Sequence, residues 1–209
     1  MNHFLGLDGT LHRAAALVAD TVVLGLLWLL FSIPIVTVGA ANTALFYAAS
    51  RRMANQETYL LRDFWQAFKA KFLRATIIWL VWLTLFSLAL FNLYLLLFTD
   101  FIQNPGAFLV PLNVIILVQL LMLQLFLYPL AARFDMRVLT TFKSAFFFCN
   151  RHLATTFFCL LFWVGLLLLP YVLLAFFPLY LIAAGIFTMA TARLIMPIFQ
   201  KYRPEMDTL

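Results

Sequence analysis

The stretch that decides the fold is ATIIWLVWLTLFSLALFNLYLLLF, residues 75–98, which contains no Asp, Glu, Lys or Arg. An apolar run of about 18 residues or more predicts a helix that spans a bilayer. A second run, residues 107–131, follows a short connection that holds the turn signal Asn104-Pro105-Gly106 and has no basic residue. The two runs predict a transmembrane hairpin. Its connection is expected on the outer side of the membrane, because basic loops stay inside.

The composition of the whole chain is typical of a membrane protein. Of 209 residues, 66% are hydrophobic and 11% are charged, whereas roughly a quarter of the residues in soluble domains are charged. The 14 Lys and Arg residues give a net charge of +6, and they lie between or beside the apolar runs, as the positive-inside rule requires of cytoplasmic segments. We therefore expect the lipid bilayer as partner, no nucleic acid, and cytoplasmic N- and C-termini.

The first apolar block, residues 14–50, is too long for one span and is interrupted at Pro34. Proline removes a backbone donor and disfavours helix in the residue before it. The pattern predicts helices at residues 14–31 and 37–53. The alternative is that residues 32–50 form a re-entrant segment, which leaves five spans.

The last apolar block predicts another hairpin, with helices at residues 153–176 and 178–198 and a reversal near Pro178. Together with the earlier runs this gives an all-α, polytopic transmembrane bundle of six spans arranged as three hairpins. Residues 1–209 are expected to form a single transmembrane domain.

Two basic segments between the spans predict amphipathic helices, at residues 58–73 and 138–149. In the first, aromatic residues recur at helical spacing beside basic residues, which is typical of a helix lying at the membrane interface. The alternative is a face that binds a partner. The residues of this interfacial or partner face are Phe64, Trp65, Phe68, Lys69, Lys71 and Phe72.

Residues 37–53 carry a stripe of small side chains, Gly39, Ala40, Ala44 and Ala48. Small residues let helices approach closely in lipid, so the stripe predicts a helix-packing face.

Three polar residues inside predicted spans form a candidate intramembrane site: Asp20, Asn42 and Asn113. A charged side chain at the centre of a membrane helix costs about 2.5 to 3.5 kcal/mol, so Asp20 requires compensation. It can contact a proton or a solute in the bundle interior, or it can be shallow or protonated and bonded to a neighbouring helix. For the amides, interhelical hydrogen bonding is the default interpretation.

No pattern of catalysis, cofactor binding or metal binding is visible. The chain has no GxSxG, HExxH, P-loop or dinucleotide glycine motif. Its three histidines are isolated in sequence, and Cys149 and Cys159 have no metal-type spacing to a histidine. We expect neither an enzyme nor a cofactor or metal site.

The segment LLWLLFSIPIVTVGAANTALFY, residues 26–47, resembles the N-terminal signature of the bacterial YesL family. Further likeness lies in RDFWQAFK, residues 62–69, and YPLAARF, residues 128–134; Gly25 stands where the family often has Asn. The resemblance implies a small protein of the bacterial inner membrane whose molecular function is unknown.

The family's gene context implies a role accessory to carbohydrate uptake or utilisation, with a sugar transporter component as partner. One alternative is a non-transporting scaffold or regulator that docks a partner through its basic loops. A second alternative is a small-solute carrier.

Overall fold

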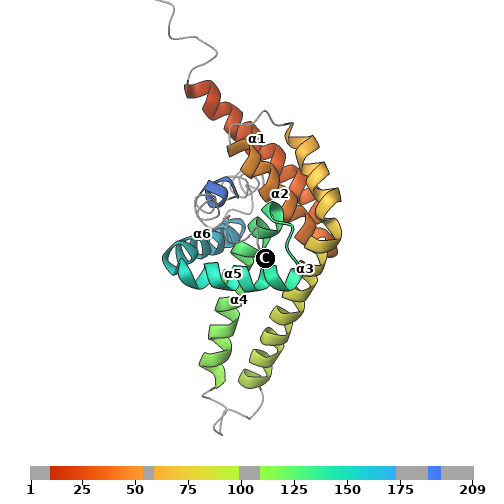
Figure 1. Cartoon of the computed structure of the whole chain (residues 1–209). Helices are drawn as coiled ribbons and strands as arrows, with labels where there is room; N and C mark the ends of the chain where they lie inside the picture. The colour runs from red at the N-terminus through yellow and green to blue at the C-terminus, as the bar shows by residue number, and fades with distance from the viewer. Residues whose placement is uncertain (1–9, 54–58, 99–108, 173–187, 194–209) are drawn as a thin grey trace, which may run out of the picture.

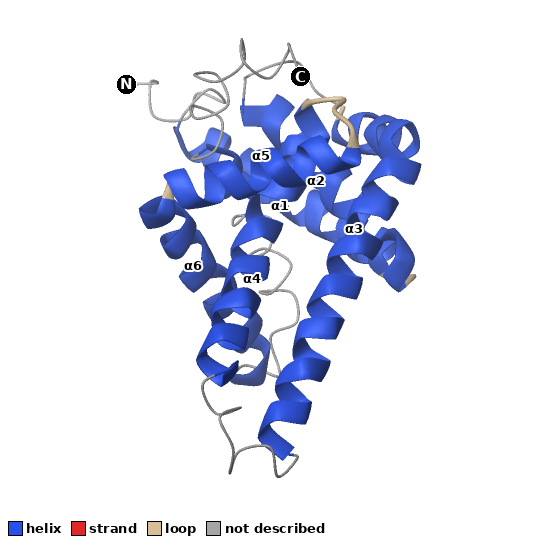
Figure 2. Ribbon diagram, turned by 60° about the horizontal axis from the view of Figure 1, so that its bottom comes forward, coloured by secondary structure: helices blue, strands red, loops and turns tan. Residues whose placement is uncertain are grey.

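The computed structural model describes residues 10–53, 59–98, 109–172 and 188–193. Within these ranges every regular element is a helix, and no strand occurs (Figures 1 and 2). The expected all-α class is therefore confirmed.

The first block forms α1 (Thr10–Ser32), a short 3₁₀ turn η1 (Ile35–Thr37) and α2 (Val38–Met53). The predicted break before Pro34 is confirmed, because α1 ends at Ser32 and Pro34 is extended with ψ 120°. The Thr37 hydroxyl donates to the carbonyls of Phe31 and Pro34 at 2.7 and 2.8 Å. This hydrogen bond, shared between two acceptors, fastens the turn that joins the two helices.

The predicted interfacial helix at 58–73 and the predicted span at 75–98 are one continuous helix, α3 (Leu60–Phe98), of 39 residues. The separation expected from the change in charge density is wrong, because no Gly or Pro interrupts residues 60–98 and nothing in the backbone ends the helix there. At 1.5 Å per residue α3 is about 58 Å long. That exceeds the roughly 45 Å of a whole bilayer with its headgroups.

The second helix of the central hairpin is α4 (Leu109–Arg133), which packs along the C-terminal part of α3. The Trp82 indole donates to the Leu120 carbonyl at 2.9 Å, and Asn113 donates to Asn92 at 2.8 Å. Both helices are long and apolar enough to cross a membrane, and most of their apolar residues face outward rather than into the protein. A soluble protein would bury such helices, so the chain is a membrane protein.

The helix α5 (Val138–Arg151) crosses the end of α4, and α6 (Leu153–Val172) follows it (Figure 1). The helix expected at 138–149 is therefore present; its place relative to a membrane stays a prediction. Of the expected span at 153–176, the structure describes residues to 172. Of the span at 178–198, it describes residues 188–193, which are helical.

Two apolar clusters hold these helices together. One lies between α3, α4 and α5 and includes Ile78, Trp82, Phe126 and Phe148. The other lies between α1, α2 and the start of α3, and it is built from Leu24, Phe64, Ala67 and the alanines of α2. The N-terminal part of α3 is thus covered by the α1–α2 hairpin, and its C-terminal part is covered by α4.

The α1–α2 hairpin does not run beside the full length of the α3–α4 hairpin. The Trp79 indole donates to the Ile35 carbonyl at 2.8 Å, which fixes the tip of α1–α2 beside Trp79. Trp79 lies about 28 Å along α3 from its end at Phe98, roughly one hydrocarbon thickness. The expectation of six spans in three hairpins is not confirmed, since the tip of the first hairpin lies far from the connected ends of α3 and α4.

Candidate functional site

The three polar residues predicted to form one intramembrane site lie in three separate places. Each is bonded to a different partner: Asp20 to Arg52, Asn42 to Trp28, and Asn113 to Asn92. None of these three hydrogen bonds joins one of the predicted site residues to another.

Asp20 is at the end of the α1–α2 hairpin opposite the η1 turn, which we call its open end. Its carboxylate accepts from the Arg52 guanidinium at 2.6 Å, and a second pair, Arg51 with Asp63 at 2.8 Å, joins α2 to α3 beside it. Asp63 is buried, with one carboxylate oxygen that has no hydrogen-bond partner. Both ion pairs tie helices together, which is the structural alternative considered for Asp20.

Asn42 lies in the contact between the two hairpins. The Trp28 indole donates to its side-chain oxygen at 2.6 Å, and the buried Tyr128 of α4 is beside it with Gln124. Asn92 and Asn113 join α3 to α4 in the same way further along. The amides therefore act as interhelical hydrogen bonds.

The small-residue stripe of α2 is buried at all four positions, Gly39, Ala40, Ala44 and Ala48. Gly39 makes the closest approach, because a Cβ atom there would overlap the Ala75 carbonyl oxygen and the Trp79 Cβ. The stripe packs against α3, as small residues do where two helices approach closely.

Lys71 and Arg74 bind the end of α4, a role that the sequence did not reveal. Lys71 Nζ donates to the carbonyls of Ala131 and Ala132 at 3.2 and 2.7 Å, and Arg74 donates to the Phe134 carbonyl at 2.9 Å. Both cations also lie 3.3 Å from the exposed Asp135 carboxylate. Cations here satisfy carbonyls that a helix C-terminus leaves unpaired. We call Lys71, Arg74 and Asp135 the clamp.

Burial lowers the pKa of Lys71, and the nearby Asp135 opposes that shift. Burial likewise lowers the pKa of Arg74, again against the effect of Asp135. The charges of the clamp are thus partly desolvated and held by fixed partners. Lys71, which was expected on an interfacial or partner face, is thus bonded to the end of α4, and its place relative to a membrane stays a prediction.

The aromatic stripe of α3 is divided between two sides of the helix. Phe64 and Phe68 are buried, and their rings lie 5.5 and 4.9 Å from the ring of Phe31 in α1. Their predicted place at the lipid interface or against a partner is wrong, because the α1–α2 hairpin covers them. Trp65 is 43% exposed and Phe72 is 37% exposed.

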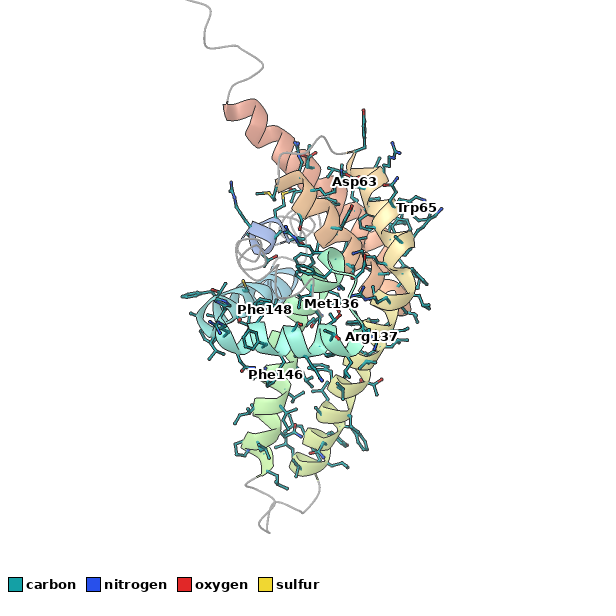
Figure 3. All side chains as sticks on the ribbon, in the orientation of Figure 1. Asp63, Trp65, Met136, Arg137, Phe146 and Phe148 are labelled. Atoms are coloured by element: carbon teal, nitrogen blue, oxygen red, sulfur yellow. The ribbon has the colours of Figure 1, made fainter. Side chains whose placement is uncertain are left out.

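Next to these buried rings α3 has an open side, which begins at Trp65, whose ring lies 5.5 Å from the ring of Phe31 in α1. Figure 3 shows Trp65 on this outer edge, and the Lys69 ammonium lies 4.7 Å from the centre of its ring. We call this surface the outer face; its exposed side chains are Leu61, Arg62, Trp65, Gln66, Lys69 and Leu73. Within the described ranges no ion pair involves Arg62 or Lys69. The outer face is therefore apolar and positively charged.

An open pocket of about 750 Å³ lies at the same end of the molecule. It is lined by Asp20, Val23, Arg52, Tyr59, Leu60, Leu61 and Arg62. No group of three or more His, Cys, Asp or Glu side chains that could hold a metal ion occurs among the residues described.

Comparison with protein families identifies the part of the chain that carries these contacts. Residues 21–93 match the family described as "Protein of unknown function, DUF624". We call residues 21–93 the DUF624 segment, after the family that they match. The YesL family is a DUF624 family, so the resemblance in the sequence is confirmed. No curated protein and no solved structure matches the chain.

The DUF624 segment runs from α1 through α2 and most of α3. It contains the packing stripe, the Arg51–Asp63 pair and the whole outer face. The clamp joins this segment to the end of α4, outside it.

Proposed function

We propose that this protein is a non-catalytic accessory protein of the bacterial inner membrane that docks a partner protein on the outer face of α3. The α3–α4 hairpin crosses the bilayer, and the N-terminal end of α3 reaches the cytoplasm together with both termini. The observation that carries the proposal is the outer face, where apolar side chains lie beside two cations that form no ion pair with another described residue.

The chemistry of the outer face favours a particular partner. Trp and Arg are enriched where proteins bind one another, and exposed aromatic and aliphatic side chains supply the apolar contact. Arg62 and Lys69 add positive charge that steers an acidic surface into register. The partner segment is therefore expected to be apolar and acidic. The family resemblance suggests a component of a sugar-uptake system, in keeping with a role in carbohydrate uptake or utilisation.

The other basic residues of this region are less suited to docking. Lys71 and Arg74 are held by α4 and Asp135, and Arg51 and Arg52 are held by Asp63 and Asp20. Charge reversal at these positions would disturb the fold, so the test must use Arg62 and Lys69.

The test places a photo-crosslinking amino acid at position 65 in native membranes. We expect an adduct with a transporter component, and we expect the double variant Arg62→Glu, Lys69→Glu to remove it. The matched control is Lys143→Glu, another exposed cation, on α5, which should leave the adduct unchanged. Adducts with phospholipid alone would contradict docking of a protein.

A second candidate function, a small-solute carrier, is favoured by the pocket beside Asp20. A carrier that binds its solute there requires the Asp20 carboxylate or the Arg52 guanidinium to exchange partners. Asp20→Asn should then reduce uptake at least several-fold while the protein still inserts. Unchanged uptake of each sugar tested would remove this candidate.

A further inference from the structure

We propose that the α1–α2 hairpin is a re-entrant element whose tip lies among the lipid acyl chains of one leaflet, the leaflet on the side of the N-terminal end of α3. This inference rests on the membrane embedding in the proposed function but not on the docking of a partner. It replaces both the six-span arrangement and the arrangement in which α1 crosses the bilayer.

One continuous surface of the hairpin is apolar and uncovered. Leu26 and Leu30 lie four residues apart and so share one side of α1, and Ile33 follows directly after its end; the three are 50%, 60% and 74% exposed. Ile35 and Val36 continue this surface over the tip at 69% and 50% exposure. We call these five residues the apolar strip. Exposing the apolar strip to water would cost about 25 cal/mol of free energy for each Å² of apolar surface.

The backbone of the tip is satisfied by protein donors although its side chains are exposed. The carbonyls of Phe31 and Pro34 accept from the Thr37 hydroxyl, and the Ile35 carbonyl accepts from the Trp79 indole. In water an exposed turn needs no such partners. In lipid an irregular backbone is stable only when its polar groups are bonded within the protein.

The distribution of charge fits an element that enters the membrane tip first. Between Asp20 and Arg51 the sequence has no Asp, Glu, Lys or Arg. The charges stand at the open end of the hairpin, in the Asp20–Arg52 and Arg51–Asp63 pairs. An intramembrane charge is costly, so the uncharged end is the end that can be submerged.

We infer that lipid covers the apolar strip, because the strip adjoins the exposed apolar surface of the spanning helix α3. The tip is bonded to Trp79, and Ile77, Leu80 and Val81 of the same spanning helix are exposed beside it at 41%, 42% and 40%. The depth follows from the same contact. Trp79 lies about 28 Å along α3 from Phe98, close to one hydrocarbon thickness, so the tip lies in the part of the near leaflet closest to its headgroups and does not emerge on the far side.

The experiment uses the full-length protein in vesicles, with Ile35→Cys in a Cys149→Ser, Cys159→Ser background. A membrane-impermeant maleimide should not react with residue 35 from either side. A fluorophore attached there should be quenched by lipids that carry a doxyl group on the acyl chain. Gln66→Cys, on the exposed outer face, is the control and should react from one side.

Two results would overturn the inference. Reaction at residue 35 from the side opposite Gln66 would show that the hairpin crosses the bilayer. Reaction from the same side as Gln66 would show that the tip lies in water. Val36→Cys and Ile33→Cys repeat the test in case one variant fails to fold. The labelling results do not depend on the crosslinking experiment at residue 65, so they can be interpreted even if no partner is found there.

Discussion

The two halves of α3 are parts of one helix, yet their exposed surfaces differ. The N-terminal half, residues 60–79, is covered on one side by the α1–α2 hairpin and exposes Arg62 and Lys69 on the other, with Trp65 at the border between the two. The C-terminal half, residues 80–98, contains no charged residue and presents Leu88, Phe91 and Tyr94, which are 63%, 59% and 57% exposed.

This difference shows that helix continuity and membrane depth are separate properties. The backbone of α3 continues because nothing interrupts it, while the environment of each half is set by the side chains that it exposes. A helix about 58 Å long that runs along the membrane normal must extend beyond the hydrocarbon core, which is about 30 Å thick. The charged half is therefore the half that extends beyond it.

The largest expected effect breaks the contact that covers the N-terminal half. Gly39→Leu should prevent α2 from packing on α3, because even a Cβ atom would overlap Ala75 and Trp79. Overpacking costs about 1–3 kcal/mol or more, and here the obstacle is backbone. We expect loss of a monodisperse protein in detergent chromatography. Gly165→Leu is the control, since a Cβ atom at Gly165 meets nothing within 4 Å; equal behaviour of the two variants would contradict the packing.

A smaller effect is expected from the buried ion pair of the same half. Asp63→Ala should lower the free energy of unfolding by about 1–3 kcal/mol, because it removes the buried carboxylate that forms the ion pair with Arg51. Thermal unfolding in detergent measures the loss. In the double variant Arg51→Ala, Asp63→Ala the two losses should not add, since they share one interaction. Simple additivity would show that the pair contributes nothing.

The clamp allows a comparison of two lysines that are two residues apart on α3. Lys71→Met should lower stability by about 1–2 kcal/mol, because the carbonyls of Ala131 and Ala132 lose their charged donor. Lys69→Met should change it by less than about 0.5 kcal/mol, because Lys69 is exposed. Equal losses in a thermal unfolding assay would contradict the assignment of the clamp.

The smallest effect on stability is expected on the outer face. The double variant Arg62→Glu, Lys69→Glu should unfold within about 0.5 kcal/mol of the unchanged protein, because neither side chain is buried. The double variant should instead lose the crosslink between position 65 and the partner. A large loss of stability would mean that these cations have a structural role and would weaken the case for docking.

Much of the fold was predictable from local patterns. The apolar runs identified α3 and α4, and Pro34 marked the end of α1, since both signals act through the backbone or the immediate neighbours. The buried Gly39–Ala48 stripe was predictable for the same reason. The continuity of α3 was missed because a change in charge density was taken for a helix boundary, although only Gly, Pro or caps end a helix.

The candidate site was predicted less well because its contacts are distant in sequence. Phe64 and Phe68 have the spacing of an interfacial stripe, and only the presence of Phe31 beside them shows that they are buried. Lys71 is indistinguishable from Lys69 by type and position, yet it meets carbonyls about 60 residues away. One signal was available: Asp135 is the one acidic residue between residues 132 and 152, which makes it the natural partner for nearby cations.

The most direct test compares Gln66→Cys with Ser87→Cys in the cysteine-free background. Both positions are exposed on α3, one in each half, so only their surroundings differ. Our account predicts that a membrane-impermeant maleimide labels residue 66 from the cytoplasmic side and leaves residue 87 unlabelled until detergent is added. Equal labelling of both residues in intact vesicles would contradict the claim that α3 passes from water into lipid.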